Sequence, residues 1–315
     1  MATRALERPP RILGLYARAA APLLPGASRL PWIGGGGGEV PDLELTLAQV
    51  RVGRERVAEY ASVCAFARRD TLPATYVHVL AFPLQLALMA DGRFPFAALG
   101  LVHVANRIVQ HRPIGLDEPL ELRVRATPSR AHSRGREFSL RSDARVAGEL
   151  VWEELATMLR RGPGGAARAG EGARARDQWT SAREDDPPAP AATWTLTSAQ
   201  WRLPGDLGRR YAAVSGDGNP IHLHALSARP FGFPRAIAHG MWTKARCLAA
   251  LAGPDGGALP AAFAVEARFR RPILLPASVD FASAADGPGV SFQVRGGGGG
   301  PSHLDGRIRA IEQSR

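Results

Sequence analysis

Apolar and polar residues alternate in several segments of this chain, on both sides of a stretch that has almost no large apolar side chains. Alternation is typical of a β-strand with one solvated face, as in residues 121–125, ELRVR. Each side also contains one continuous apolar segment that is compatible with a helix. The predicted strands include residues 101–114, 148–161, 263–273 and 303–311, and the predicted helical segments are residues 80–90 and 241–251.

The intervening stretch, residues 162–190, is rich in Gly, Ala, Pro and charged residues. Such a composition buries too little apolar surface to offset the entropy of ordering, so it predicts a flexible linker. We therefore expect an N-terminal extension at residues 1–40, a first domain at 41–161 and a second domain at 191–315. Two glycine tracts, residues 34–38 and 296–300, are expected to be a connection to the first domain and a loop between two strands.

The two domains look like copies of one another. Residues 43–66 and 194–217 each contain a strand-like segment followed by a helical turn that reaches a tyrosine, Tyr60 or Tyr211, and an Arg-Pro-Ile triplet follows later in both. One helix and several strands per copy predict an α+β fold, in which a curved antiparallel sheet buries a helix.

The copies differ in their polar residues. Aligning the two tyrosines places Cys64–Phe66 opposite Ser215–Asp217, and we expect Ala81–Pro83 to stand opposite Ala238–Gly240. The first copy lacks the acid and is predicted to be catalytically degenerate. Its apolar replacements are expected to open a cavity for a long acyl tail.

Residues 211–241 carry the chemistry of the second copy. Asp217 and His222 flank the rigid pair Asn219-Pro220, and His239-Gly240 follows at the start of the apolar segment. An acid and a base fixed on one short, turn-rich loop suit proton transfer. A turn alone would account for the Gly, Asn and Pro residues, but it would not require Asp217 and His222 around them.

This stretch resembles the hydratase motif of the MaoC-like family, which includes the (R)-specific enoyl-CoA hydratases. The motif positions are Tyr211, Ser215, Gly216, Asp217, Asn219, Pro220 and His222, followed by Ile237, His239, Gly240 and Met241. The resemblance implies a hotdog fold, and with the internal repeat it implies two hotdogs in tandem that pair edge to edge. It also implies reversible hydration of 2-enoyl thioesters to (3R)-hydroxyacyl thioesters by the dyad Asp217 and His222, with neither a metal nor another cofactor.

Other polar residues of the second copy have candidate roles in binding. Gly240, at the N-terminal end of the apolar segment, is the candidate donor of an N–H group to the thioester oxygen, or it is required only for close packing. Asn219, His239 and Ser215 contact substrate or only fix the loop. Arg268 and Arg271 meet the phosphates of a carrier or are a solvated strand face. A separate alternative is a metal site formed by Asp217, His222 and His224.

The composition narrows the partners. The net charge is +11, but Lys244 is the single lysine and the arginines are scattered, which argues against nucleic-acid binding. A positive surface instead suits an anionic carrier such as coenzyme A or an acyl carrier protein. Cys64 and Cys247 lie among apolar residues and suit reduced thiols in the cytoplasm. No apolar run is long enough for stable membrane insertion, and two such chains could form a homodimer.

Two further functions compete with the hydratase. A hotdog thioesterase would need a carboxylate that activates water against the carbonyl itself, which the motif around Asp217 does not favour. A non-catalytic subunit that binds acyl thioesters is the other alternative, and the presence of one complete copy beside the degenerate one argues against it.

Overall fold

The computed structural model describes residues 2–20, 39–162 and 197–312. The extension and the first half contain β1 (Ala2–Leu6), α1 (Ile12–Ala20), β2 (Leu43–Val50), α2 (Arg54–Cys64), α3 (Ala74–Met89), β3 (Val102–Gln110), β4 (Leu120–Ala126), β5 (Arg130–His132), β6 (Gly135–Val146) and β7 (Glu149–Arg161). The second half contains β8 (Thr197–Leu203), α4 (Leu207–Ser215), α5 (Pro220–Leu223), α6 (Ala225–Ala228), η3 (Arg229–Phe231), α7 (Gly240–Ala252), β9 (Phe263–Phe269), β10 (Ala277–Asp286), β11 (Gly289–Gly296) and β12 (Ser302–Ala310).

The strands form one twelve-stranded sheet that shows the internal repeat directly. Its order is β1-β2-β4-β6-β7-β3-β9-β12-β11-β10-β8, with β5 paired to β6. If β1 of the extension and the short β5 are left out, each half, counted from its own first strand, has the order first, third, fourth, fifth, second. The two second strands, β3 and β9, pair antiparallel with Arg107 opposite Glu266, and these side chains form a salt bridge. The predicted edge-to-edge pairing of two hotdogs is therefore confirmed.

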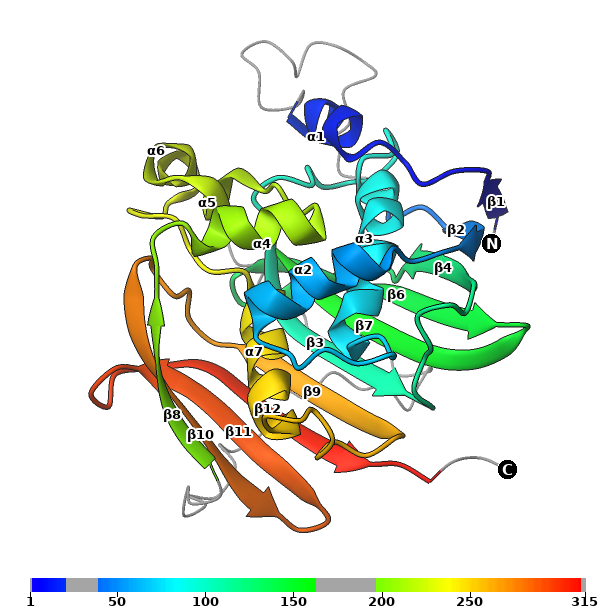
Figure 1. Cartoon of the computed structure of the whole chain (residues 1–315). Helices are drawn as coiled ribbons and strands as arrows, with labels where there is room; N and C mark the ends of the chain where they lie inside the picture. Colours follow the sequence, from blue (N-terminus) through cyan, green and yellow to red (C-terminus); the bar gives the residue numbers. More distant parts are fainter. Residues whose placement is uncertain (1, 21–38, 163–196, 313–315) are drawn as a thin grey trace.

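The helices α3 and α7 contact each other in the concave side of this sheet (Figure 1). One apolar core runs through both halves. The landmark tyrosines Tyr60 and Tyr211 are both buried, and their rings lie 6.1 Å apart across the contact between α2 and α4. The two halves therefore share one core, and this core fixes the position of α7 relative to α3.

The helix ends confirm one alignment of the two copies. Helix α2 ends at Cys64 and is capped by Ala65 at φ 59°, whereas α4 ends at Ser215 and is capped by Gly216 at φ 74°. Both caps are left-handed, a conformation that commonly ends helices. Phe66 in the first half thus corresponds to Asp217 in the second.

The other alignment was wrong. Helix α3 begins at Ala74 rather than near Leu80, so Ala81–Pro83 lie in its interior. The residues opposite Ala238–Gly240 are Leu72–Ala74, because the N–H of Leu72 donates to Ile114 O just as the N–H of Ala238 donates to Ile273 O. The residues of α3 are buried on nearly every face of the helix. Its sequence therefore lacks the alternation of apolar and polar faces that would show where the helix starts.

The described part of the extension packs on the body of the protein. Strand β1 pairs in parallel with β2, from Ala2 opposite Leu43 to Leu6 opposite Leu47. Helix α1 packs against α3 (Figure 1). The glycine tract 34–38 and nearly all of the predicted linker 162–190 lie outside the described residues. The tract 296–300 forms the expected turn between β11 and β12.

Candidate active site

A cavity of about 690 Å³ opens between the two halves. Residues of the second half line one part of it, including Asp217, Asn219, His222, His239 and Gly240. Residues of the first half, from α3, β3, β6 and β7, line the rest. The structure therefore brings the motif residues together at one cavity, which extends into the first half.

The motif loop is held by short-range hydrogen bonds. Ser215 Oγ accepts the N–H of Asp217 (3.2 Å), and Asn219 Oδ1 accepts the N–H of Ile221, which caps the short helix α5. Pro220 begins this helix, where the missing N–H of proline costs nothing. Asn219 lines the cavity whereas Ser215 does not. Both side chains thus fix the loop, and only Asn219 is placed to contact substrate.

Glycine 208 explains how α4 approaches α5 so closely. A Cβ atom at Gly208 would lie 1.9 Å from the carbonyl oxygen of His222, so any larger residue would displace the backbone of His222. The glycine is thus required for close approach of two backbones. It fixes His222 relative to the helix that ends next to Asp217.

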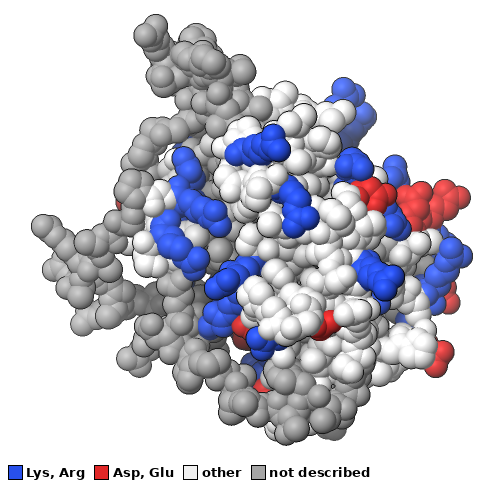
Figure 2. Space-filling view, turned by 90° about the vertical axis from the view of Figure 1, so that its left-hand side faces the viewer, with Lys and Arg blue, Asp and Glu red and all other residues white. Residues whose placement is uncertain are grey.

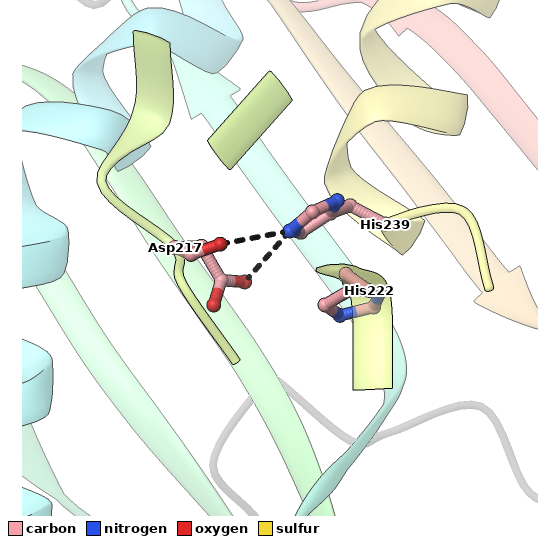
Figure 3. Close-up of side chains that lie close together, drawn as sticks. All are labelled: Asp217, His222 and His239. Carbon is pink, nitrogen blue, oxygen red and sulfur yellow. Dashed lines mark hydrogen bonds and ion pairs between the residues drawn. The ribbon is translucent and has the colours of Figure 1, made fainter. Parts of the chain in front are cut away.

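Asp217, His222 and His239 form one compact cluster (Figure 3). The rings of His222 and His239 stack with centroids 3.6 Å apart. His239 Nε2 lies 3.0 Å from the main-chain oxygen of Asp217 and 3.7 Å from its Oδ2 (Figure 3). His239 therefore holds the main chain of the motif loop, which is one of the two roles that the sequence left open for it.

Hydrogen bonds select the tautomers of the two histidines. His222 Nδ1 lies 2.8 Å from the carbonyl oxygen of Ile237, so Nδ1 carries the proton and Nε2 is left as an acceptor. His239 donates from Nε2 to Asp217 O, and its buried Nδ1 has no partner among the described residues. The unprotonated Nε2 of His222 can thus take a proton from water or substrate.

The charges at neutral pH follow from the surroundings. Burial raises the pKa of Asp217, but His239, His222 and a hydrogen bond from Tyr16 outweigh it and lower this pKa below its usual range. Burial lowers the pKa of His222, and it lowers the pKa of His239 to about 3. The cluster therefore holds a carboxylate beside two neutral imidazoles, which suits acid–base chemistry.

The extension contributes a residue that sequence reasoning missed. Tyr16 on α1 donates from its hydroxyl to Asp217 Oδ1 at 2.9 Å. Its ring packs against Gly218, and Ile12 packs against Gly216. Burial and the charge of Asp217 raise the pKa of Tyr16, so the hydroxyl stays protonated and donates. No local signal in the sequence joins Tyr16 to a loop 201 residues away.

Gly240 is the first residue of α7, next to His239 in the cap position. The first N–H groups of a helix have no partner within it, and the helix dipole favours negative charge there. A Cβ atom at Gly240 would lie 3.0 Å from the ring of Phe269, so the glycine also permits close packing. Both interpretations of Gly240 in the sequence therefore agree with its surroundings.

Arginines from both halves line the cavity. Arg268 and Arg271 line it as anticipated, and Arg130, Arg134 and Arg161 of the first half line it as well. The side of the molecule that carries α5, α6 and β8 shows many basic and few acidic side chains (Figure 2). Positive charge of this kind suits an anionic ligand.

One predicted alternative receives no support in the geometry. His224 accepts the N–H of Leu226 through Nδ1 and is exposed, so it caps α6 rather than joining the cluster. The three side chains that lie within metal-binding distance of each other are instead Asp217, His222 and His239, whose ligand atoms lie within 4.8 Å. None of the helices in the described ranges is long and apolar enough to cross a membrane.

Comparisons with known proteins agree with this geometry. Residues 182–299 match the model of the MaoC like domain. The chain is 33% identical over 294 residues to 3-hydroxyacyl-thioester dehydratase X of Mycobacterium tuberculosis, with 93% of this chain and 96% of the relative covered. A crystal structure of HtdX from that organism has a TM-score of 0.70 and 32% identity, and covers 85% of this chain and 100% of its own.

A second solved structure supports the fold alone. Another protein of Mycobacterium tuberculosis, described as having a double hotdog fold, has a TM-score of 0.53 at 16% identity. The similarity covers 88% of this chain and 96% of that one. The tandem hotdog architecture is thus found in proteins of low sequence identity.

Proposed function

Because the chain belongs to the family of MaoC-like dehydratases, we propose that it catalyses the reversible hydration of 2-enoyl thioesters to (3R)-hydroxyacyl thioesters. The observation that carries this proposal is the placement of the Asp217 carboxylate and the unprotonated Nε2 of His222 at one cavity, beside the first N–H of α7. The name of the curated relative, a 3-hydroxyacyl-thioester dehydratase, supports the same reaction class.

The reaction needs a base for the attacking water, a proton donor for C2 and a hydrogen-bond donor for the thioester oxygen, and different site residues can supply them. In hydration, the oxygen of a water held between Asp217 and His222 attacks C3, and one proton of that water passes to the dyad. The electron pair of the C2–C3 double bond moves toward the thioester, whose oxygen gains charge and accepts the N–H of Gly240. C2 then takes a proton from the dyad, so no charge remains. Dehydration follows the same steps in reverse.

The two halves divide the work in this proposal. The second half, residues 191–315, carries the dyad. The first half, residues 41–161, has Phe66 at the place of the acid and contributes apolar cavity residues such as Phe82, Leu140 and Met158. Arg268 and Arg271 would bind the phosphates of coenzyme A or the phosphopantetheine of an acyl carrier protein, in the cytoplasm. A homodimer of such chains is compatible with this arrangement.

The test is loss of the ultraviolet absorbance of the enoyl thioester, followed with crotonyl-CoA and a longer 2-enoyl-CoA in the presence of a chelator. We expect hydration by the wild type, and loss of at least about a thousandfold in Asp217→Asn and His222→Gln with retained acyl-CoA binding. The matched control is His224→Gln, which changes a nearby exposed histidine and should keep the wild-type rate.

Four outcomes would contradict or change the proposal. Unchanged rates in Asp217→Asn would show that the dyad is elsewhere. Release of free thiol from acyl-CoA without loss of the enoyl band would indicate the thioesterase instead. If neither coenzyme A thioesters nor acyl carrier protein thioesters react while both bind, the chain is a binding subunit. Loss of activity in the chelator alone would assign a metal to the cluster of Asp217, His222 and His239.

A further inference from the structure

Helix α3 presents a partly polar row of side chains to the cavity. His78, Phe82, Gln85 and Met89 follow the spacing of one helix face and all line the cavity. His78 is only 9% exposed and Gln85 only 2%. Two buried polar side chains thus line the cavity, and the methylene groups of an unsubstituted acyl tail could form no hydrogen bond with them.

A buried carboxylate anchors both of them from behind. Glu154 on β7 accepts His78 Nδ1 at 2.8 Å, Gln85 Nε2 at 2.9 Å and Asn106 Nδ2 at 2.7 Å. Burial by itself raises the pKa of Glu154, but His78 and the hydrogen bonds from His78 and Asn106 lower it to about 2. Glu154 is therefore a carboxylate, and a carboxylate can only accept hydrogen bonds. The donor atoms of its neighbours, His78 Nδ1 and Gln85 Nε2, must therefore point toward it.

The remaining polar atoms of the pair are open to the cavity. Gln85 Nε2 donates to Glu154 and to Ser142 Oγ (2.9 Å), which leaves Oε1 on the other side of the amide. Since Nδ1 of His78 is bonded to Glu154, Nε2 is the free ring nitrogen. In the described part of the chain, neither His78 Nε2 nor Gln85 Oε1 has a hydrogen-bond partner. Neither atom belongs to the fully buried polar atoms that lack a partner, so both remain accessible.

A hydroxyl group matches this pair of atoms. An amide oxygen can only accept, so its partner must donate; a ketone, an ester or a carboxylate could not satisfy it. A hydroxyl can donate its single proton to either of these two acceptors, to Gln85 Oε1 or to His78 Nε2, because the ring proton of His78 lies on Nδ1 toward Glu154. Both atoms belong to side chains held by the same carboxylate, so both offer an acceptor in the first-half part of the cavity.

We propose that His78 and Gln85 form a polar subsite in the first half of the cavity that binds a hydroxyl group on the acyl chain of the substrate. This inference rests on the proposed function and names its substrate class: 2-enoyl and 3-hydroxyacyl thioesters with a further hydroxyl group along the chain. Phe82 and Met89 flank the subsite on α3 and contact the neighbouring methylene groups.

The position of the subsite assigns it to the acyl chain rather than to the carrier. Phe269 packs over Gly240, its ring contacts that of His103 with centroids 5.0 Å apart, and His103 stacks on His78 at 6.3 Å. Two side chains, Phe269 and His103, thus separate His78 from Gly240. Arg270 and Arg271, which line the same cavity, are exposed and mark its open end, whereas His78 and Gln85 are buried.

The test compares trans-2-decenoyl-CoA with its 8-hydroxy, 9-hydroxy and 10-hydroxy derivatives by kcat/KM for hydration. We expect the wild type to prefer at least one hydroxylated substrate by about tenfold, since a site built to hydrogen-bond a hydroxyl discriminates against the analogue that lacks it. His78→Asn keeps a donor for Glu154 but removes Nε2, and Gln85→Leu removes Oε1. Each should lower the preference about fivefold, the worth of one hydrogen bond.

The matched control is Phe82→Leu, which changes the same face of α3 without changing its polarity. It should alter the rates with all four substrates by a similar factor. Equal losses with all four substrates in His78→Asn and Gln85→Leu would assign the pair to folding or to the carrier and overturn the proposal. A wild type that hydrates decenoyl-CoA but prefers no hydroxylated derivative would overturn it without any variant. A wild type that hydrates no enoyl thioester, crotonyl-CoA included, would mean that the proposed function itself fails.

Discussion

The hydrogen bond from Tyr16 to Asp217 can be removed without disturbing the packing around it. Tyr16→Phe deletes the hydroxyl, which donates to Oδ1 at 2.9 Å, and keeps the ring that packs on Gly218. Oδ2, which faces His239, then loses the restraint that the bond at Oδ1 places on the carboxylate. We expect Asp217 to stay in the site with a less fixed orientation and a weaker preference for the charged form.

The magnitude follows from the type of bond. A hydrogen bond to a charged group contributes about 1.5–3 kcal/mol. The side chain of Asp217 is 28% exposed, so water can replace part of this. We therefore expect a loss near the lower end of that range, about 1.4 kcal/mol or tenfold in kcat, with little change in KM. The bond also helps lower the pKa of Asp217, so its removal raises this pKa and moves the acidic limb of the pH–rate profile to higher pH.

Measurement of kcat, KM and the pH profile with crotonyl-CoA tests this reasoning. Tyr60→Phe is the matched control, because it removes a buried tyrosine hydroxyl that bonds Thr75 Oγ1 at 2.9 Å, away from the cluster. It should lower the midpoint of thermal unfolding and leave the pH profile in place. Leu13→Ala, at an 86% exposed position of the same helix α1, should change nothing. A Tyr16→Phe enzyme with the wild-type kcat and the wild-type acidic limb would refute a positioning role for Tyr16.

Three further substitutions probe other parts of the site. Gly208→Ala forces a Cβ atom against the carbonyl of His222, so kcat should fall at least about tenfold while circular dichroism shows a folded protein. Lys244→Met leaves acceptors such as Asn106 Oδ1 unpaired in the core and should cost about 3 kcal/mol in chemical denaturation. Because burial lowers the pKa of Lys244 to about 7, the unfolded chain binds more protons between that pH and about 10.4, so wild-type stability should rise over this interval and the variant should not share the rise. Ala156→Leu narrows the cavity in the first half, so kcat/KM with a long 2-enoyl-CoA should fall about tenfold while that with crotonyl-CoA stays within about twofold, and equal losses would place the acyl tail elsewhere.

The sequence predicted those features that depend on local pattern. Alternating residues and the repeated Tyr and Arg-Pro-Ile landmarks predicted two copies of a sheet around one helix, and the MaoC-like resemblance identified this arrangement as a tandem hotdog. Helix α7 begins within one residue of the expected position. The start of α3 was missed because this helix is apolar on nearly every side, and Pro83, which usually marks a helix boundary, lies inside it. Hydrophobic periodicity can place a helix only when one face is polar.

The features that were not predicted depend on contacts between distant segments. Tyr16 reaches Asp217 because α1 packs against α3 next to the loop that carries Asp217, and no spacing rule connects the two residues. Glu154 lies in a strand of alternating pattern, where a carboxylate would be read as solvated, yet it is only 2% exposed. Whether a polar side chain on a strand is buried depends on what the opposite layer offers, here His78 and Gln85, and a single sequence does not contain that information.

The pseudo-two-fold relation of the halves explains why the degenerate copy keeps a buried polar network. Counted from the first residues of α3 and α7, Ala74 corresponds to Gly240 and His78 corresponds to Lys244. Lys244 Nζ donates to Asn106 Oδ1, and Asn106 Nδ2 in turn donates to Glu154, which holds His78. Equivalent positions on the two central helices are therefore joined by one chain of hydrogen bonds through the seam between β3 and β9. A buried polar network stabilises the fold only if every member has a hydrogen-bond partner. The loss of Lys244 should therefore weaken the hydrogen bonds that hold His78 and also lower the stability of the fold. If our proposed subsite is correct, Lys244→Met should also reduce the preference for a hydroxylated acyl chain, at a temperature where the variant remains folded; an unchanged preference would show that Glu154 holds His78 without help from the catalytic helix.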